Sequence, residues 1–160
     1  MEFDVNVINP FLASAKRTTA MVAQIDLSIG KPYIRELKFD NEFVRIILGV
    51  TGAMTGQVII SMPEGKARDI ASRMMMGMPV ETLDDMAISA ISELGNMIMG
   101  TAATILSENG VIIDITPPVV ELGTVYMNMK SFQNVCVPLL LDNEVYMELN
   151  IIVKVKTDTE

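Results

Sequence analysis

The stretch AISAISELGNMIMGTAATIL, residues 87–106, predicts one long α-helix and guides the interpretation of the rest of the chain. At about 100° per residue, its apolar side chains gather on one side of that helix. These residues are Ala87, Ile91, Leu94, Ile98 and Ile105. A helix with one apolar side buries it against another layer, so the segment predicts a fold in which helices cover a sheet.

Small and polar residues fall on the opposite side of the same helix: Ser89, Glu93, Asn96, Gly100 and Ser107. Glu93 and Asn96 are three residues apart, so their side chains point the same way. An ordinary solvent-exposed face is one interpretation. A docking face is favoured by two observations: Asn and Gly each cost up to about 1 kcal/mol relative to Ala inside a helix, and this side carries no lysine or arginine. Gly100 leaves no side chain to obstruct an approaching surface.

Hydrophobic patterns predict further helices and strands before and after this helix. Further helices are expected at 5–24, with Pro10 near the first turn, and at 63–76, with Gly77 just past the end. Strand patterns occupy 25–29, 33–39, 42–50, 57–62, 111–115, 119–127, 132–141 and 144–156, and Asp142-Asn143 predicts a tight turn between the last two. The order predicts an α+β fold of two similar halves, with helices packed against an extended, mainly antiparallel sheet.

Length and charge narrow the class of protein. The 160 residues predict a single domain, 1–160. A net charge of −8 argues against nucleic acid and anionic membranes as partners. No apolar run approaches the roughly 18–20 residues that span a bilayer, and the opening MEFDVNVINPF lacks the features of a signal peptide. A cytoplasmic protein is therefore expected, with the single cysteine, Cys136, as a small core residue.

The chain contains no histidine, which excludes several kinds of catalysis. Ser-His-Asp and Cys-His nucleophilic sites, zinc sites that use histidine, and phosphohistidine transfer all require it. The sequence also has no GxxxxGK[ST] phosphate loop and no CxxC pair. No metal site is expected, and any chemistry must use carboxylates, amides, hydroxyls, lysines or groups from a partner.

The segment SAISELGN, Ser89 to Asn96, resembles the [Asp/Ser]-xxx-Glu-xx-Asn pattern of the CheC/CheX/FliY family of response-regulator phosphatases. That pattern continues to a proline a little over twenty residues downstream, and Pro118 lies 22 positions after Asn96. Pro117 fits almost as well, and the roles of both prolines stay open. INPF at 8–11 and GAMTGQVIISMPEGKARDIASRMM at 52–75 are similar to the family too, so the resemblance spans most of the chain.

Length and element order resemble CheX-like members, which carry one Glu-xx-Asn helix, whereas two-site relatives carry a second in the first helix. Here the corresponding segment NPFLASAKRTTAMV, 9–22, contains no glutamate, so one site is expected. The resemblance implies hydrolysis of the aspartyl phosphate on a CheY-like response regulator. Asn96 would position the attacking water and Glu93 would pair with the regulator's active-site lysine.

Ser89, which opens the motif, is expected either to contact the partner or only to shape the helix face, and Gly100 is expected to contact the partner because of its place on that face. The resemblance also implies Mg²⁺ held by the regulator, with no cofactor on this chain. A homodimer is implied as well. The long apolar strands at 132–141 and 144–156 would favour it if they formed an exposed sheet edge.

Several alternatives stay open. The same helix could dock on a response regulator or flagellar-switch component as a non-catalytic adaptor. Asp84 and Asp85 are adjacent and do not face each other on a helix, so N-terminal capping is favoured over catalysis. Methionines 74, 75, 76 and 78 are compatible with an adaptable partner surface, but core and edge packing is favoured.

Overall fold

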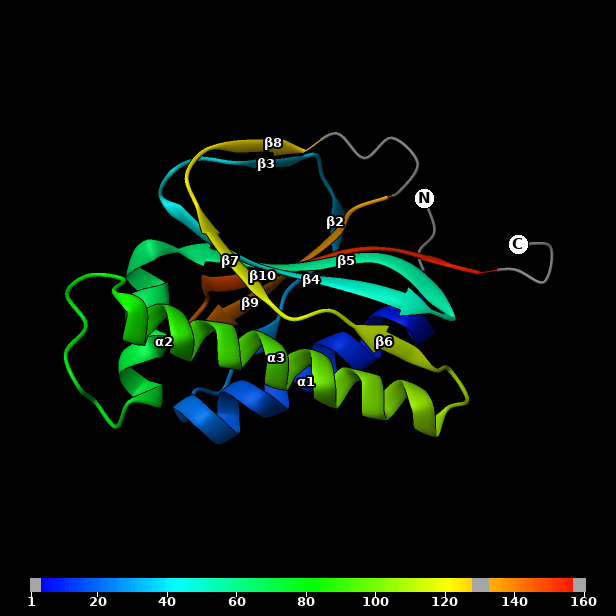
Figure 1. Cartoon of the computed structure of the whole chain (residues 1–160), viewed down its shortest axis with the longest axis horizontal. Coiled ribbons are helices and arrows are strands. Elements are labelled where there is room, and N and C mark those ends of the chain that lie inside the picture. Colours follow the sequence, from blue (N-terminus) through cyan, green and yellow to red (C-terminus); the bar gives the residue numbers. More distant parts are fainter. Residues whose placement is uncertain (1–3, 128–132, 157–160) are drawn as a thin grey trace.

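The computed structural model describes residues 4–127 and 133–156, and within them it contains three helices and ten strands (Figure 1). The helices are α1 (Val5–Ala23), α2 (Glu64–Met74) and α3 (Asp85–Glu108). The strands are β1 (Ser28–Ile29), β2 (Tyr33–Ile34), β3 (Leu37–Phe39), β4 (Phe43–Gly52), β5 (Met54–Pro63), β6 (Ile113–Ile115), β7 (Val119–Leu122), β8 (Val125–Met127), β9 (Val135–Leu141) and β10 (Glu144–Val155).

Most predicted elements are confirmed, and the differences have local causes. The pattern at 33–39 forms two short strands, β2 and β3, which pair with different partners. The pattern at 119–127 is interrupted at Gly123, whose φ of +102° bends the chain between β7 and β8. Pro10 lies in the second turn of α1 rather than the first, so it removes a helical hydrogen bond there. Residue 132 of the predicted strand 132–141 lies outside the described residues.

The strand pairing confirms two equivalent halves. Each half contributes a long helix followed by five strands. The main sheet has the order β1-β9-β10-β5-β4-β6, with β2 added to β9 and β7 added to β4, and all of its pairs are antiparallel. The fifth strands of the halves, β5 and β10, pair at the centre, and the third strands, β3 and β8, form a separate ribbon. In each half the fourth strand pairs with the first two strands of the other half.

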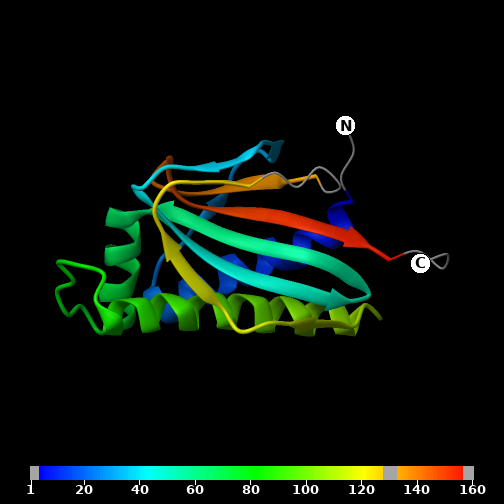
Figure 2. The same cartoon turned by 45° about the horizontal axis from the view of Figure 1, so that its top comes forward.

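The layers follow from this pairing. Helices α1 and α3 lie side by side on one face of the sheet, and the β3–β8 ribbon lies over the other face (Figures 1 and 2). The main core lies between the helices and the sheet, where Ile46 and Leu48 of β4 and Ile91 of α3 are fully buried. A smaller cluster beneath the ribbon contains Leu37, Phe39, Ile59 and Ile152. The predicted α+β fold is confirmed.

The strands at 135–141 and 144–155 do not form the exposed sheet edge that would favour a dimer. β10 lies between β9 and β5, and the other side of β9 is covered by β1 and β2. β1 and β2 follow one another along β9, and between them the Gly30 N–H donates to the Pro138 carbonyl at 2.8 Å. Strands as short as β1 and β2 carry too little periodicity to be recognised as the cover of a longer strand.

Candidate functional site

The exposed face of α3 carries the candidate site. Ser89, Glu93 and Asn96 are exposed, and Gly100 is partly exposed. On the opposite face Ala87, Ile91, Leu94 and Ile98 are completely buried, and Ile105 is half-buried. A Cβ atom built on Gly100 meets no other atom within 4 Å, so a partner has open access to that turn. The two-faced helix expected from the sequence is therefore present, with its polar and small residues facing outward.

Close packing fixes the position of α3. A Cβ atom built on Gly95 would lie 2.5 Å from Cγ2 of Ile46, so the absent side chain lets the helix backbone approach β4. From α1, the buried Ser14 hydroxyl donates to the carbonyl of Ile98. The Asp84 carboxylate caps the start of the helix by accepting from the Ala87 N–H at 2.9 Å, which confirms its predicted capping role. Glu93 and Asn96 thus project from a firmly held helix.

The Glu93 and Asn96 side chains make no hydrogen bond or ion pair with any residue that the structure describes. A carboxylate and an amide that face solvent without internal partners can both be used by another molecule, because contact with it costs no existing bond. Among residues 4–127 and 133–156 there is no group of three His, Cys, Asp or Glu side chains that could hold a metal ion. The described helices also include none long and apolar enough to cross a membrane.

Helix α1 offers a comparison within the same chain. Asn6 and Asn9 are exposed and have the same spacing as Glu93 and Asn96, but both are amides and they lie in the first two turns of α1, nearer its start than Glu93 and Asn96 are to the start of α3. The two prolines left open by the sequence join β6 to β7, in a connection that runs beside α3 (Figure 1). Pro117 is exposed and Pro118 is partly buried. The position of the two prolines in this connection does not give either of them a chemical role.

The methionine run divides into two pairs. Met74 and Met75 pack against the main core, as expected. Met76 is 98% exposed and Met78 is 53% exposed, so the prediction of core and edge packing is wrong for these two. Sequence reasoning also missed Met86, which is 60% exposed in the first turn of α3. The exposure of Met86 could have been predicted from its spacing, because it precedes Glu93 by seven residues and so lies on the same face of the helix.

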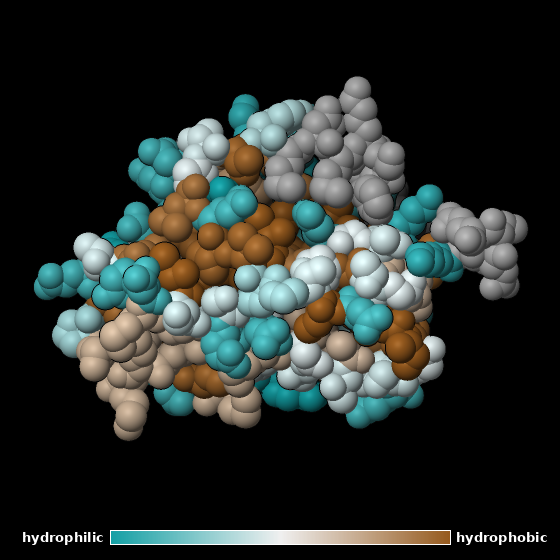
Figure 3. All heavy atoms as spheres, in the orientation of Figure 1, coloured by the Kyte–Doolittle hydropathy of each residue, from teal (hydrophilic) through white to brown (hydrophobic). Residues whose placement is uncertain are grey.

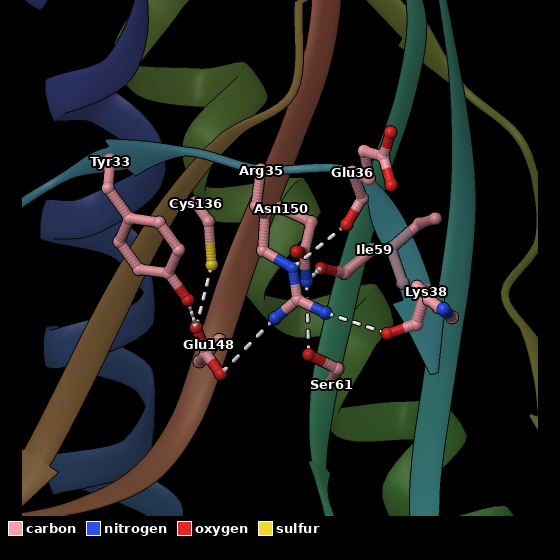
Figure 4. A network of polar contacts seen from close by, with 9 residues as sticks. All are labelled: Tyr33, Arg35, Glu36, Lys38, Ile59, Ser61, Cys136, Glu148 and Asn150. Atoms are coloured by element: carbon pink, nitrogen blue, oxygen red, sulfur yellow. Dashed lines mark hydrogen bonds and ion pairs between the residues drawn. The ribbon is translucent and has the colours of Figure 1, made fainter. Parts of the chain in front are cut away.

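A second polar cluster lies between β2, β9 and β10 (Figure 4). Oε2 of Glu148 accepts from the Tyr33 hydroxyl at 2.5 Å and from the Cys136 thiol at 2.7 Å. The Arg35 guanidinium lies 3.6 Å from the other carboxylate oxygen. Burial, together with donation to Glu148, raises the pKa of the Cys136 thiol to about 12. A thiol that stays protonated and buried is no nucleophile, so Cys136 belongs to the packing of the sheet, as expected.

The fold and this helix define a class: the CheC-like proteins. A CheC-like superfamily protein from Shewanella sp. PV-4 has a TM-score of 0.81 and 26% identity, over 95% of this chain and 99% of that one. Residues 44–140 match the family model described as chemotaxis phosphatase CheX. The chain is 35% identical to the CheY-P phosphatase CheX of Thermotoga maritima, over 94% of this chain and 97% of that protein. The chain therefore belongs to the CheX family.

A structure of a complex is also similar to this chain. The CheX–CheY–BeF₃–Mg²⁺ complex from Borrelia burgdorferi contains a chain with a TM-score of 0.76 and 28% identity. The match covers 94% of the present chain and 99% of that one. That structure is a complex of a CheX protein with CheY, BeF₃ and Mg²⁺.

Proposed function

We propose that this chain hydrolyses the aspartyl phosphate of a CheY-like response regulator by inserting the outer face of α3 into the regulator's active site. The observation that carries the proposal is the pair Glu93 and Asn96, exposed and without internal partners on a helix held close to the sheet. The 35% identity to a CheY-P phosphatase supports the reaction, and the CheX–CheY complex supports the kind of partner.

Asn96 would supply the chemistry. Hydrolysis of an acyl phosphate requires a water molecule held in line with phosphorus, and little covalent help from the protein. A carboxamide both donates and accepts hydrogen bonds, so Asn96 can hold that water while it contacts the phosphoryl oxygens. Because the amide is neutral, it enters an anionic site without the repulsion that a carboxylate would meet. Positioning of this kind lowers the barrier without consuming any group of the enzyme.

Glu93, one turn before Asn96, would pair with a lysine of the regulator and fix the register of the helix. Ser89 and Gly100 would border the contact, and Mg²⁺ would be held by the regulator, as the presence of Mg²⁺ in the related complex suggests. A single domain in the cytoplasm is part of the proposal. The charge of −8 and the absence of any long apolar run in the sequence support this location.

The Glu93→Gln variant is expected to raise KM for the phosphorylated regulator about fivefold and to leave kcat nearly unchanged, because a solvent-exposed ion pair contributes up to about 1 kcal/mol. The dependence of KM on salt should also weaken, since screening acts on the charge that the variant lacks. Steady-state phosphate release at two salt concentrations measures both effects. Glu108→Gln, at the far exposed end of α3, is the matched control. A Glu93→Gln variant with wild-type KM and salt dependence would contradict the docking role.

Hydrolysis and simple binding are separated by measuring both on the same partner. The wild-type chain should bind the regulator loaded with beryllofluoride and Mg²⁺, and should also accelerate phosphate loss from the phosphorylated regulator. Binding without acceleration would support the adaptor function instead. In that case Glu93 would be the residue that carries the interaction.

We also propose a homodimer, supported by the resemblance to CheX-like proteins rather than by the strand edge that was expected. The short outer strands β1 and β2 expose Ile29 and Tyr33, at 46% and 41%. Burial of such side chains against a second copy would be favourable. Light scattering at micromolar concentration should give twice the mass of one chain, and a monomer under these conditions would overturn the dimer.

A further inference from the structure

Three exposed methionines lie in the first turn of α3 and in the connection before it. Met86 is seven residues before Glu93, a rotation of about 20° around the axis, so both side chains point the same way. Met76 and Met78 lie in the connection between α2 and α3. We call Met76, Met78 and Met86 the methionine rim.

Two residues of the methionine rim, Met78 and Met86, line a hollow of about 290 Å³, and Met76 lies outside its lining. Met78 and Met86 line it together with Pro79, Val80, Glu81 and Asp84. The connection is at the left of Figure 1, and in Figure 3 the lower part of that region is tan, on the hydrophobic side of the scale, while the upper part is teal and white. The hollow combines apolar side chains with the carboxylates of Glu81 and Asp84, so it fits a protruding side chain that is apolar in part and has a positive charge beside it.

The backbone holds Met76 in solvent. Its φ of +60° is unusual for a residue with a side chain, and Gly77 follows with a φ of +85°. The Gly77 N–H donates to the Ser72 carbonyl at 2.8 Å and so closes the end of α2 around this turn. A glycine or asparagine would satisfy the same turn with less strain. Because Met76 is 98% exposed, its side chain adds nothing to the core of this chain.

We propose, on the basis of the proposed function, that the methionine rim is a second docking point for the phosphorylated response regulator. Met86 lies ten residues before Asn96, which places it about 15 Å along the helix from the reacting group. The rim therefore contacts a patch of the regulator about that far from the phosphoryl group. Continuity with the Glu93–Asn96 face identifies the occupant, because a regulator seated on those residues extends over the adjoining turn.

The chemistry of the hollow indicates which side chains the matching patch of the regulator carries. Methionine is flexible and polarisable, and surfaces built from it adapt to apolar side chains of different shapes. Glu81, Asp84 and Asp85 are exposed around the hollow and give its border a negative charge. The matching patch of the regulator therefore contains an apolar side chain with a lysine or arginine beside it. Such a contact adds affinity and selects among regulators without taking part in the reaction.

The test uses the full chain with Met76, Met78 and Met86 all changed to Gln, which keeps the length of each side chain and makes it polar. Binding is measured to the response regulator loaded with beryllofluoride and Mg²⁺, and phosphate release from the phosphorylated regulator gives kcat and KM. The triple variant should raise Kd and KM at least about tenfold while kcat changes less than about twofold. Its thermal unfolding should match that of the wild type, because the side chains are exposed.

Ile112→Gln is the matched control, since Ile112 is 62% exposed and follows the opposite end of α3. Its Kd should equal that of the wild type. A triple variant with wild-type Kd, or one whose only change is from dimer to monomer, overturns the rim as a regulator contact. A wild-type chain that binds without hydrolysis overturns the catalytic proposal alone and leaves the rim to be judged by Kd. A wild-type chain that does not bind overturns both.

Discussion

Replacement of Asn96 with alanine is expected to lower the rate of regulator dephosphorylation at least about a hundredfold, because removal of one positioned polar group commonly costs that much in rate. The exposed amide makes no hydrogen bond within the described part of the chain that the variant would break. Alanine is also the better helix former, by up to about 0.7 kcal/mol. The variant should therefore be at least as stable as the wild type while being nearly inactive.

Asn9→Ala supplies the matched control for this variant. Asn9 is an exposed amide in α1, three residues after Asn6, and loses the same atoms on substitution. Its stability should change in the same direction as that of Asn96→Ala, but its phosphatase rate should stay at the wild-type value. Regulator binding by Asn96→Ala should remain within a few-fold of wild type, because Glu93 and the rest of the face are intact.

Gly95→Ala is expected to lower the free energy of unfolding by about 2 kcal/mol, although alanine favours helices by about 1 kcal/mol over glycine. The new Cβ atom would lie 2.5 Å from Cγ2 of Ile46 and 3.5 Å from Cδ1 of Leu48. Both residues are fully buried in β4, and β-branched Ile46 has little freedom to rotate away. Helix α3 must therefore move off the sheet, and urea denaturation measures the cost.

Gly100→Ala makes the same change five residues further along α3, where the new Cβ atom meets nothing within 4 Å. This variant should gain up to about 1 kcal/mol from helix propensity. Opposite effects of the two substitutions would show that Gly95 serves the packing of the helix and that Gly100 does not. Equal effects on stability would contradict the close approach of α3 to β4. Regulator affinity should fall for Gly100→Ala, because its Cβ atom projects from the docking face.

The main features of α3 could be predicted because they depend on its own residues. The buried row from Ala87 to Ile98 and the Asp84 cap follow from helical spacing and local hydrogen bonding. Likewise, the predicted turn at Asp142 and Asn143 is present, with both residues at positive φ. The two similar halves were recognised from element order, although only the pairing of β5 with β10 and of β3 with β8 reveals their symmetry.

Features that depend on distant residues could not be predicted. The cover of β9 by β1 and β2 is set by tertiary pairing of strands that are two residues long. The exposure of Met76 results from a left-handed backbone turn that composition does not reveal, since a methionine run after an amphipathic helix is usually buried. The place of Glu93 and Asn96 on an exposed face was predictable, whereas their freedom from internal partners required the structure.

The central claim is that the Asn96 amide promotes the attack of water on the regulator's phosphoaspartate. The most direct test measures phosphate release from a phosphorylated CheY-like regulator of the same organism, alone, with the wild-type chain, and with equal amounts of Asn96→Ala. We predict acceleration by the wild type and almost none by Asn96→Ala, although the variant still binds the beryllofluoride-loaded regulator. Equal acceleration by both chains, or by neither, would contradict the account.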